Sequence, residues 1–195
     1  MDEACRQAAI WRASGCPRFR IAVNLFSAQV TSGTLASILM ACLARHGLPP
    51  EALEVEVTET IALDNDSQVL EPFRELRRRD VRVAFDDFGT GHASLSTLKR
   101  FPLTTLKIDR NFVRDLLTEP ADAAIVQALL AMGRGMGLDV IVEGIETKEQ
   151  QAALLAMGCR LGQGFLFGKA LPAAEFSRLL REQQKAAPVK ARLYQ

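Results

Sequence analysis

The stretch Val81-Arg82-Val83-Ala84-Phe85-Asp86-Asp87-Phe88-Gly89-Thr90-Gly91 decides the fold, because an apolar run ends there in two carboxylates and a glycine turn. Asp86 and Asp87 would repel each other at the mouth of a buried strand unless cations neutralise them. A strand that ends in Asp-Asp before a Gly-x-Gly loop is typical of an edge that presents oxygen ligands to hard divalent metals. An acidic turn or a helix N-cap explains the same letters, so the neighbouring segments must decide.

The bulk properties indicate one ordinary globular domain. The chain has 195 residues, 48% of them hydrophobic and 24% charged, with a net charge of +1, which gives no sign of binding a nucleic-acid polymer. Four scattered cysteines without CxxC spacing are expected to be reduced thiols. No run reaches the ~20 apolar residues of a membrane segment, and no signal-peptide pattern is present, so we expect a cytoplasmic protein.

Apolar runs alternate with amphipathic helical patterns along the whole chain. We expect strands at residues 20–25, 53–60, 81–86, 103–109, 138–143 and 159–162, and helices at residues 4–14, 31–46, 65–79, 92–100, 121–136, 147–156 and 173–184. Six successive β–α units predict an α/β fold with a parallel sheet and helical crossovers.

Acidic side chains recur where these strands end. Asp86 and Glu143 stand at two strand ends, Glu56 stands near a third, and Asn24 and Lys107 hold similar positions. One strand-terminal acid is usually a cap for the next helix. A set of them on strand after strand converges only when the strands form a ring or fan with one shared carboxyl-terminal face. The pattern therefore favours a TIM-type (β/α) barrel with a metal site on that face.

The donor set indicates the metal and the reaction. Glu56, Asp86, Asp87 and Glu143 supply carboxylate oxygens and no sulfur, which suits Mg²⁺ or Mn²⁺ better than zinc or copper. Four carboxylates are too many for one ion, so we expect two, and a pair of divalent ions serves phosphodiester hydrolysis. Lys107 would position the attacking water or neutralise developing charge, although a lysine that snorkels to the surface is an alternative explanation.

Six ordered motifs resemble the EAL-domain family of cyclic di-GMP-specific phosphodiesterases. They are Val23-Asn24-Leu25, Glu56-Val57-Thr58-Glu59-Thr60, Asp86-Asp87-Phe88-Gly89-Thr90-Gly91 with Ser94-Leu95, Leu106-Lys107-Ile108-Asp109-Arg110, Glu143-Gly144-Ile145-Glu146-Thr147 and Gly162-Gln163-Gly164-Phe165. The resemblance runs from about residue 3 to residue 180. It implies a partial EAL-like domain over residues 1–185, followed by a flexible tail over residues 186–195.

The resemblance implies a two-metal site. Asn24, Glu56 and Asp86 would bind the first Mg²⁺ or Mn²⁺ ion, and Glu56 would count among the catalytic residues. Asp86, Asp87 and Glu143 would bind the second ion, with Asp86 bridging the pair.

The resemblance also implies roles around the metals. Lys107 would hold or deprotonate the attacking water, and Gln163 would lie at the substrate edge of the site. Asp109 would be a further substrate-side residue or a support for a neighbouring loop. Glu59 would anchor the Asp-Phe-Gly-Thr-Gly loop, which in this family links the metal site to a dimer interface, and Glu146 would support its own loop.

Some family features are missing or altered. The resemblance implies that the first two of eight barrel strands are absent, and with them the Glu-Ala-Leu motif whose glutamate completes the metal shell. About six strands would remain, and an incomplete barrel has open edges. Smaller departures are Phe26 for a usual serine, His92 for a usual tyrosine and Ala170 for a usual proline.

Two functions are in competition. The first is hydrolysis of cyclic di-GMP to linear pGpG by two metals, impaired here by the lost glutamate. The alternative is a non-catalytic EAL-like receptor for cyclic di-GMP or a protein-interaction module. The missing glutamate favours the alternative, whereas the four retained carboxylates favour the enzyme. We also expect a homodimer that covers the open edge, and upstream sensor or diguanylate cyclase domains in a longer protein.

Overall fold

Six parallel strands form the centre of the molecule. The computed structural model describes residues 1–59, 61, 67–89 and 95–186. Its strands are hydrogen-bonded in chain order, and every pair is parallel. They are β1 Ile21–Asn24, β2 Leu53–Thr58, β3 Arg82–Phe88, β4 Thr105–Ile108, β5 Asp139–Val142 and β6 Leu161–Gly162.

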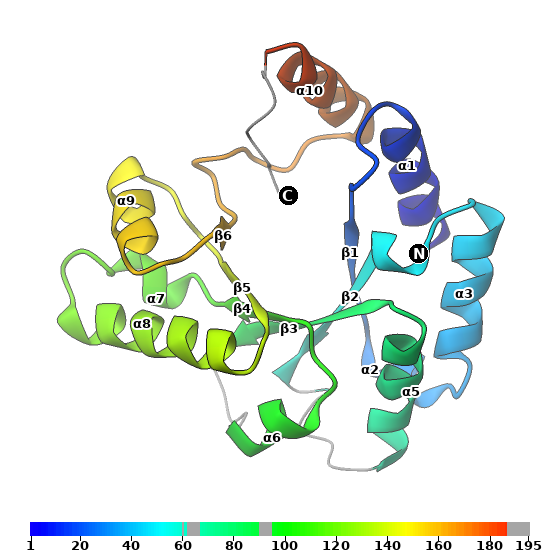
Figure 1. Ribbon diagram of the computed structural model, residues 1–195, viewed down its shortest axis with the longest axis horizontal. Coiled ribbons are helices and arrows are strands. Elements are labelled where there is room, and N and C mark those ends of the chain that lie inside the picture. The colour runs from blue at the N-terminus through cyan, green and yellow to red at the C-terminus, as the bar shows by residue number, and fades with distance from the viewer. Residues whose placement is uncertain (60, 62–66, 90–94, 187–195) are drawn as a thin grey trace.

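Helices lie along the outer side of an arc of strands, which leaves the inner side facing the middle of the molecule (Figure 1). They are α1 Asp2–Ala13, α2 Ser27–Thr31, α3 Leu35–Arg45, the 3₁₀ turn η1 Pro50–Ala52, α5 Ser67–Arg78, α6 Leu95–Arg100, α7 Asn111–Arg114, α8 Pro120–Gly135, α9 Lys148–Ala156 and α10 Ala173–Ala186. The arrangement is a six-stranded part of a (β/α) barrel, which confirms the predicted fold class.

The two faces of the sheet have opposite chemistry, because side chains alternate along each strand. The outer face is apolar: Val55, Val57, Phe85, Leu106 and Ile108 are completely buried. Their neighbours on the inner face are polar and charged. The hydrophobic core therefore lies between the sheet and its helices, and the inner face is free to carry ionic groups.

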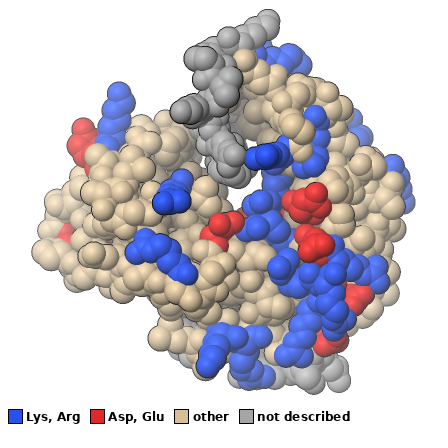
Figure 2. Space-filling view, viewed as in Figure 1, with Lys and Arg blue, Asp and Glu red and all other residues tan. Residues whose placement is uncertain are grey.

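An ion-pair network crosses the amino-terminal ends of the strands on the inner face. Glu54 of β2 is 4% exposed, and its Oε2 atom accepts hydrogen bonds from Arg82 Nε at 3.0 Å and from Thr105 Oγ1 at 2.7 Å. Arg82 also donates to Asp139, so the network links β2, β3, β4 and β5. Arg20, before β1, lies 3.7 Å from the same Glu54 oxygen. In Figure 2, acidic and basic side chains meet over the middle of the sheet.

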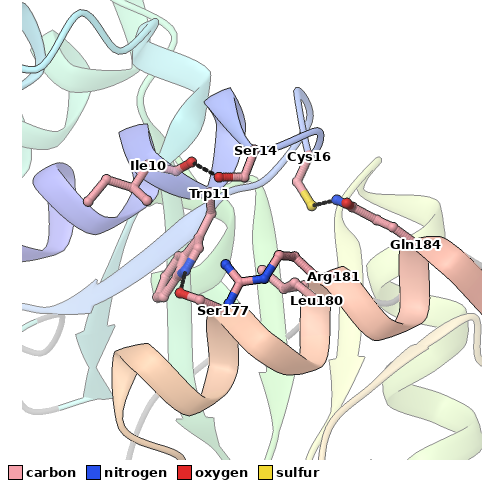
Figure 3. A pocket seen from close by; sticks show the side chains of 8 residues that line it. All are labelled: Ile10, Trp11, Ser14, Cys16, Ser177, Leu180, Arg181 and Gln184. Atoms are coloured by element: carbon pink, nitrogen blue, oxygen red, sulfur yellow. Dashed lines mark hydrogen bonds between the residues drawn. The ribbon is translucent and has the colours of Figure 1, made fainter.

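Helices α1 and α10 pack against each other, although they stand at opposite ends of the chain (Figure 3). The Trp11 ring packs edge-on against Phe19 and Phe176, with both pairs of centroids 4.9 Å apart, and its Nε1 atom donates to Ser177 Oγ at 2.8 Å. A small pocket with mostly apolar lining lies beside this contact. It lies at a helix–helix junction and holds none of the predicted carboxylates.

The structure differs from the sequence-based expectations at a few boundaries. Strand β3 continues past Asp86 to Phe88, the helix predicted at residues 31–46 is observed as α3 over Leu35–Arg45, and the short helix α2 before it was not predicted. The short helix α7 has no counterpart among the predicted elements. Part of the predicted helix 92–100, including His92, lies outside the described residues. Among the helices that are described, none combines the length and the apolarity that crossing a membrane requires.

Candidate metal centre

Lys107 stands at the centre of a carboxylate cluster at the carboxyl-terminal ends of the strands. Its Nζ atom lies 2.9 Å from Glu56 Oε1, 2.7 Å from Asp86 Oδ1 and 2.7 Å from Glu143 Oε1. The lysine side chain is only 5% exposed. Residues from β2, β3 and β4 and the residue just after β5 thus meet at one point, as expected for one shared barrel face.

A backbone irregularity brings Asp86 and Asp87 into the same site. Adjacent residues of a regular strand point to opposite faces. Here the pairing of β3 with β4 shifts register between Phe85 and Phe88, and Asp87 has a φ of 53°, in the left-handed region. A bulge of this kind redirects a side chain beside a functional site. As a result, carboxylate oxygens of Asp86, Asp87 and Glu143 all lie within 4.8 Å of one another.

Asp109 extends the cluster from the end of β4. It is 7% exposed, and its Oδ1 atom accepts a hydrogen bond from the backbone N–H of Asn111 at 2.8 Å. Asp109 therefore supports the start of α7. Its proposed contact with substrate stays a prediction.

Gln163 contacts the cluster directly. The residue follows β6, and its Nε2 atom donates to Glu143 Oε1 at 2.6 Å. The loop that carries Glu143 packs closely against the backbone of Gly164. A Cβ added at Gly164 would lie 2.2 Å from the Ile145 carbonyl oxygen. The same loop is fixed further along, where Gln150 Oε1 accepts the backbone N–H of Glu146 at 2.8 Å. The Glu143 carboxylate is therefore oriented by contacts from two loops.

The electrostatics of the cluster reflect burial and crowding. Burial raises the pKa of Glu56 and of Glu143, and nearby Asp86 raises both further, while Lys107 partly opposes these effects. The pKa of Asp87 is raised by burial and by repulsion from Asp86 and Asp109. Burial lowers the pKa of Lys107, but the Glu56 and Glu143 charges outweigh it and raise the pKa above its usual value. Lys107 is thus favoured as the ammonium. Glu56, Asp86 and Glu143 share that one positive charge.

The donor set fits hard divalent metal ions. Among the described residues, the groups that could bind a metal here are carboxylate oxygens, which is the chemistry that Mg²⁺, Mn²⁺ and Ca²⁺ prefer. Asp86 Oδ1 is buried and accepts no well-directed hydrogen bond, although Lys107 Nζ lies close to it. A buried carboxylate oxygen with spare lone pairs is a group that a metal would satisfy.

The remaining predicted residues lie around this cluster. Asn24 is exposed at the end of β1, directly beside Glu56 in the strand register. Glu59 is 7% exposed and, within the described part of the chain, neither of its carboxylate oxygens has a hydrogen-bond partner. The loop that it was expected to anchor includes residues 90–94, outside the described residues, so this role stays a prediction. Glu146 is exposed and contributes its backbone to the turn before α9.

The letters Glu-Ala-Leu do occur in the chain, but at the wrong end of a strand. Glu51 is exposed in η1, and Leu53 is the first residue of β2. Glu56, the β2 residue in the cluster, lies further along the same strand. The described residues therefore place Glu51 away from the carboxylates.

Sequence reasoning missed two features of the site. The first is the left-handed conformation at Asp87. This conformation is usually predicted from a glycine, and the position holds aspartate. The second is the hydrogen bond from Gln163 to Glu143, since two loops separated in sequence give no local signal of contact. A further feature, the capping box at the start of α9, could have been found from the Thr-x-x-Gln pattern of Thr147 and Gln150. In it the Gln150 N–H donates to Thr147 Oγ1 at 3.1 Å.

Comparison with known proteins adds a family to this geometry. Residues 1–170 match the family model of the EAL domain. The chain is 40% identical over 183 residues to the signaling protein YkoW of Bacillus subtilis, covering 94% of this chain and 23% of YkoW. It is 42% identical over 175 residues to the bifunctional diguanylate cyclase/cyclic di-GMP phosphodiesterase MucR of Pseudomonas aeruginosa, covering 90% of this chain and 26% of MucR. The chain thus spans about a quarter of the length of these relatives.

Solved structures give the same result. The phosphodiesterase MucR in complex with cyclic di-GMP superposes with a TM-score of 0.84 at 42% identity, over 90% of this chain and 71% of that one. Klebsiella pneumoniae BlrP1, in a complex with manganese and cyclic di-GMP, gives a TM-score of 0.80 at 32% identity, over 86% of this chain and 42% of that one. With the EAL model matched over residues 1–170 and a similar fold in the solved relatives, this chain belongs to the EAL domain family.

Proposed function

We propose that this chain is the metal-binding part of a domain that hydrolyses cyclic di-GMP to linear pGpG. The observation that carries the proposal is the convergence of Glu56, Asp86, Asp87 and Glu143 around Lys107 at the ends of the strands. Relatives named as cyclic di-GMP phosphodiesterases, including PdeR of Escherichia coli at 36% identity, support the substrate.

The proposed metal ligands fall into two sets, one for each ion. Asn24, Glu56 and Asp86 would hold one metal ion, and Asp86, Asp87 and Glu143 the second, with Asp86 shared. Two divalent ions in such a site polarise the phosphodiester and lower the pKa of a bound water. Mg²⁺ or Mn²⁺ is proposed on the chemistry of the oxygen donors.

Lys107 and Gln163 would act beside the two metal ions, on the attacking water and on the substrate. The Lys107 ammonium is held among the carboxylates, where it is placed to hold the attacking water through its N–H groups; to take a proton from that water it would first have to lose one of its own. Gln163 keeps Glu143 in one orientation through a 2.6 Å hydrogen bond, and its exposed position suits a contact with substrate. Asp109 would be a further residue on the substrate side, or a support for its own loop through the hydrogen bond with the Asn111 N–H.

Turnover by the chain itself tests the proposal. The protein of residues 1–195 would be incubated with cyclic di-GMP and either Mg²⁺ or Mn²⁺, and pGpG would be followed by chromatography. We expect slow, metal-dependent conversion that Asp86→Asn abolishes, because Asp86 is assigned to both metals. A half-buried acid in the first turn of α8, Asp122, gives the matched control Asp122→Asn, which should leave turnover unchanged.

Binding without turnover would favour the receptor function. Ca²⁺ and cyclic di-GMP would be added during thermal unfolding, since a ligand that binds only the native state raises the melting temperature. A ligand-dependent rise with no pGpG under any metal would refute the hydrolase and leave a cyclic di-GMP receptor. No rise and no pGpG would refute both functions for this chain.

A further inference from the structure

The Lys107 ammonium occupies the middle of the proposed metal site. An ammonium has three N–H donors, and the three contacts of Nζ, at 2.9, 2.7 and 2.7 Å, go to three different carboxylates. The side chain is 5% exposed, so water replaces few of these contacts. Each ion pair of the ammonium is therefore made with a residue assigned to metal.

Lys107 also supplies the positive charge nearest to these acids. Glu56, Asp86 and Glu143 share this one ammonium, and Asp87 adds a further carboxylate whose oxygen lies within 4.8 Å of two of them. Like charges so close, in a site largely removed from water, repel strongly. Without metal, the ammonium is what allows the carboxylates to remain together.

The same oxygens cannot serve both cations fully. Asp86 and Glu143 bind Lys107 and also belong to the group that could hold a metal ion. A divalent ion among them would stand a few ångströms from the ammonium and repel it. We propose that Lys107 is the resident cation of the metal-free site and that divalent ions enter by exchange with its ammonium.

This inference rests on the metal site of the proposed function and adds a determinant of metal affinity. Every ion that binds must first weaken the contacts of Lys107 with Asp86 and Glu143. Lys107 therefore stabilises the empty site and weakens the binding of metal, in addition to any contact with substrate.

Metal titration of variants tests the exchange without substrate. Lys107→Gln removes the charge, Lys107→Arg keeps it, and Lys148→Gln removes an exposed lysine at the start of α9 as a matched control. Mn²⁺ binding would be measured by calorimetry at pH 8, and melting temperature in the presence of a chelator. We expect Lys107→Gln to bind Mn²⁺ at least tenfold more tightly than the native chain and to melt lower in chelator. The other two variants should stay within about threefold of the native affinity.

A measurement on the native chain tests the exchange even if the Lys107→Gln variant does not fold. Lysine side chains labelled with ¹⁵N give ammonium signals in NMR, and a buried ammonium with three acceptors exchanges slowly with water. We expect one such signal in chelator, missing from Lys107→Gln, that shifts or disappears as Mg²⁺ is added. The proposal is overturned if saturating Mg²⁺ leaves this signal unmoved, or if folded Lys107→Gln binds Mn²⁺ no more tightly than the native chain.

These outcomes are separable from the proposed function. Exchange of Lys107 with metal in a chain that makes no pGpG would support the inference and count against the hydrolase. Metal-dependent turnover with an unmoved Lys107 signal would support the hydrolase and refute the inference.

Discussion

The side-chain amide of Gln163 donates a 2.6 Å hydrogen bond to Oε1 of Glu143, the same oxygen that lies 2.7 Å from Lys107. Groups that orient a metal ligand typically contribute a factor of about 10–100 to metal affinity. We expect Gln163→Ala to weaken Mn²⁺ binding by about tenfold, as measured by calorimetry. Gln127→Ala, at an exposed position of α8, is the control. An unchanged affinity in Gln163→Ala would limit Gln163 to contact with substrate.

Gly164 is expected to tolerate no side chain. Its φ is 155°, and an added Cβ would lie 2.2 Å from the carbonyl oxygen and 2.3 Å from the backbone nitrogen of Ile145. Backbone atoms cannot move aside as the end of a side chain does, so Gly164→Ala should cost at least ~2 kcal/mol of unfolding free energy in urea. Gly135→Ala is the matched control, because nothing lies within 4 Å of its added Cβ. That helical substitution should be neutral or stabilise by up to ~1 kcal/mol.

The network at the amino-terminal ends of the strands should be sensitive to the loss of one partner. Arg82→Met would leave the Glu54 side chain, 5% exposed, paired with the Arg20 guanidinium at 3.7 Å and with the Thr105 hydroxyl. Removing one partner of a buried ion pair typically costs about 3–5 kcal/mol, and the remaining contacts favour the lower end of that range. Adding Glu54→Gln to Arg82→Met should recover part of the loss in urea unfolding. A double variant less stable than Arg82→Met would contradict this explanation.

Phe26 occupies a position where serine should be better. The residue is the N-cap of α2, with extended φ and ψ of −105° and 149°, and its ring is 70% exposed. Gln29 Oε1 already accepts the Phe26 backbone N–H at 2.9 Å, which is one half of a capping box. Serine would supply the other half by accepting the Gln29 N–H, so Phe26→Ser should stabilise the fold by about 0.5–1 kcal/mol. A loss of stability on chemical denaturation would show that the ring has a packing role.

The fold could be predicted from the sequence because the same strand–helix pattern repeats along the chain. Six apolar runs, each followed by an amphipathic helix, predicted all six strands, and the acids near strand ends predicted which side chains would meet. Lys107 was placed among them by the family resemblance, whereas the residue pattern alone favoured a lysine that snorkels to the surface, which its 5% exposure contradicts. The start of α3 was placed four residues too early because Gly33 was overlooked as a break, and α2 was missed because five residues are too few to show a helical period.

The details of the centre depend on contacts that no local pattern encodes. Asp87 reaches the site through a left-handed residue and a shift of register, both of which arise from how β3 fits against β4. The bond between Gln163 and Glu143 joins segments 20 residues apart in sequence. Such pairings are set by tertiary packing and become visible only in three dimensions.

The division of the sheet into an apolar outer face and a charged inner face also bears on how such a protein can change over time. Residues such as Val55 and Leu106 pack on the side of the helices, whereas Glu56 and Lys107 belong to the charged cluster on the other side. Substitutions in the cluster can therefore accumulate on one face while the packing on the other face stays intact. A descendant of this chain could keep the fold after losing the cluster.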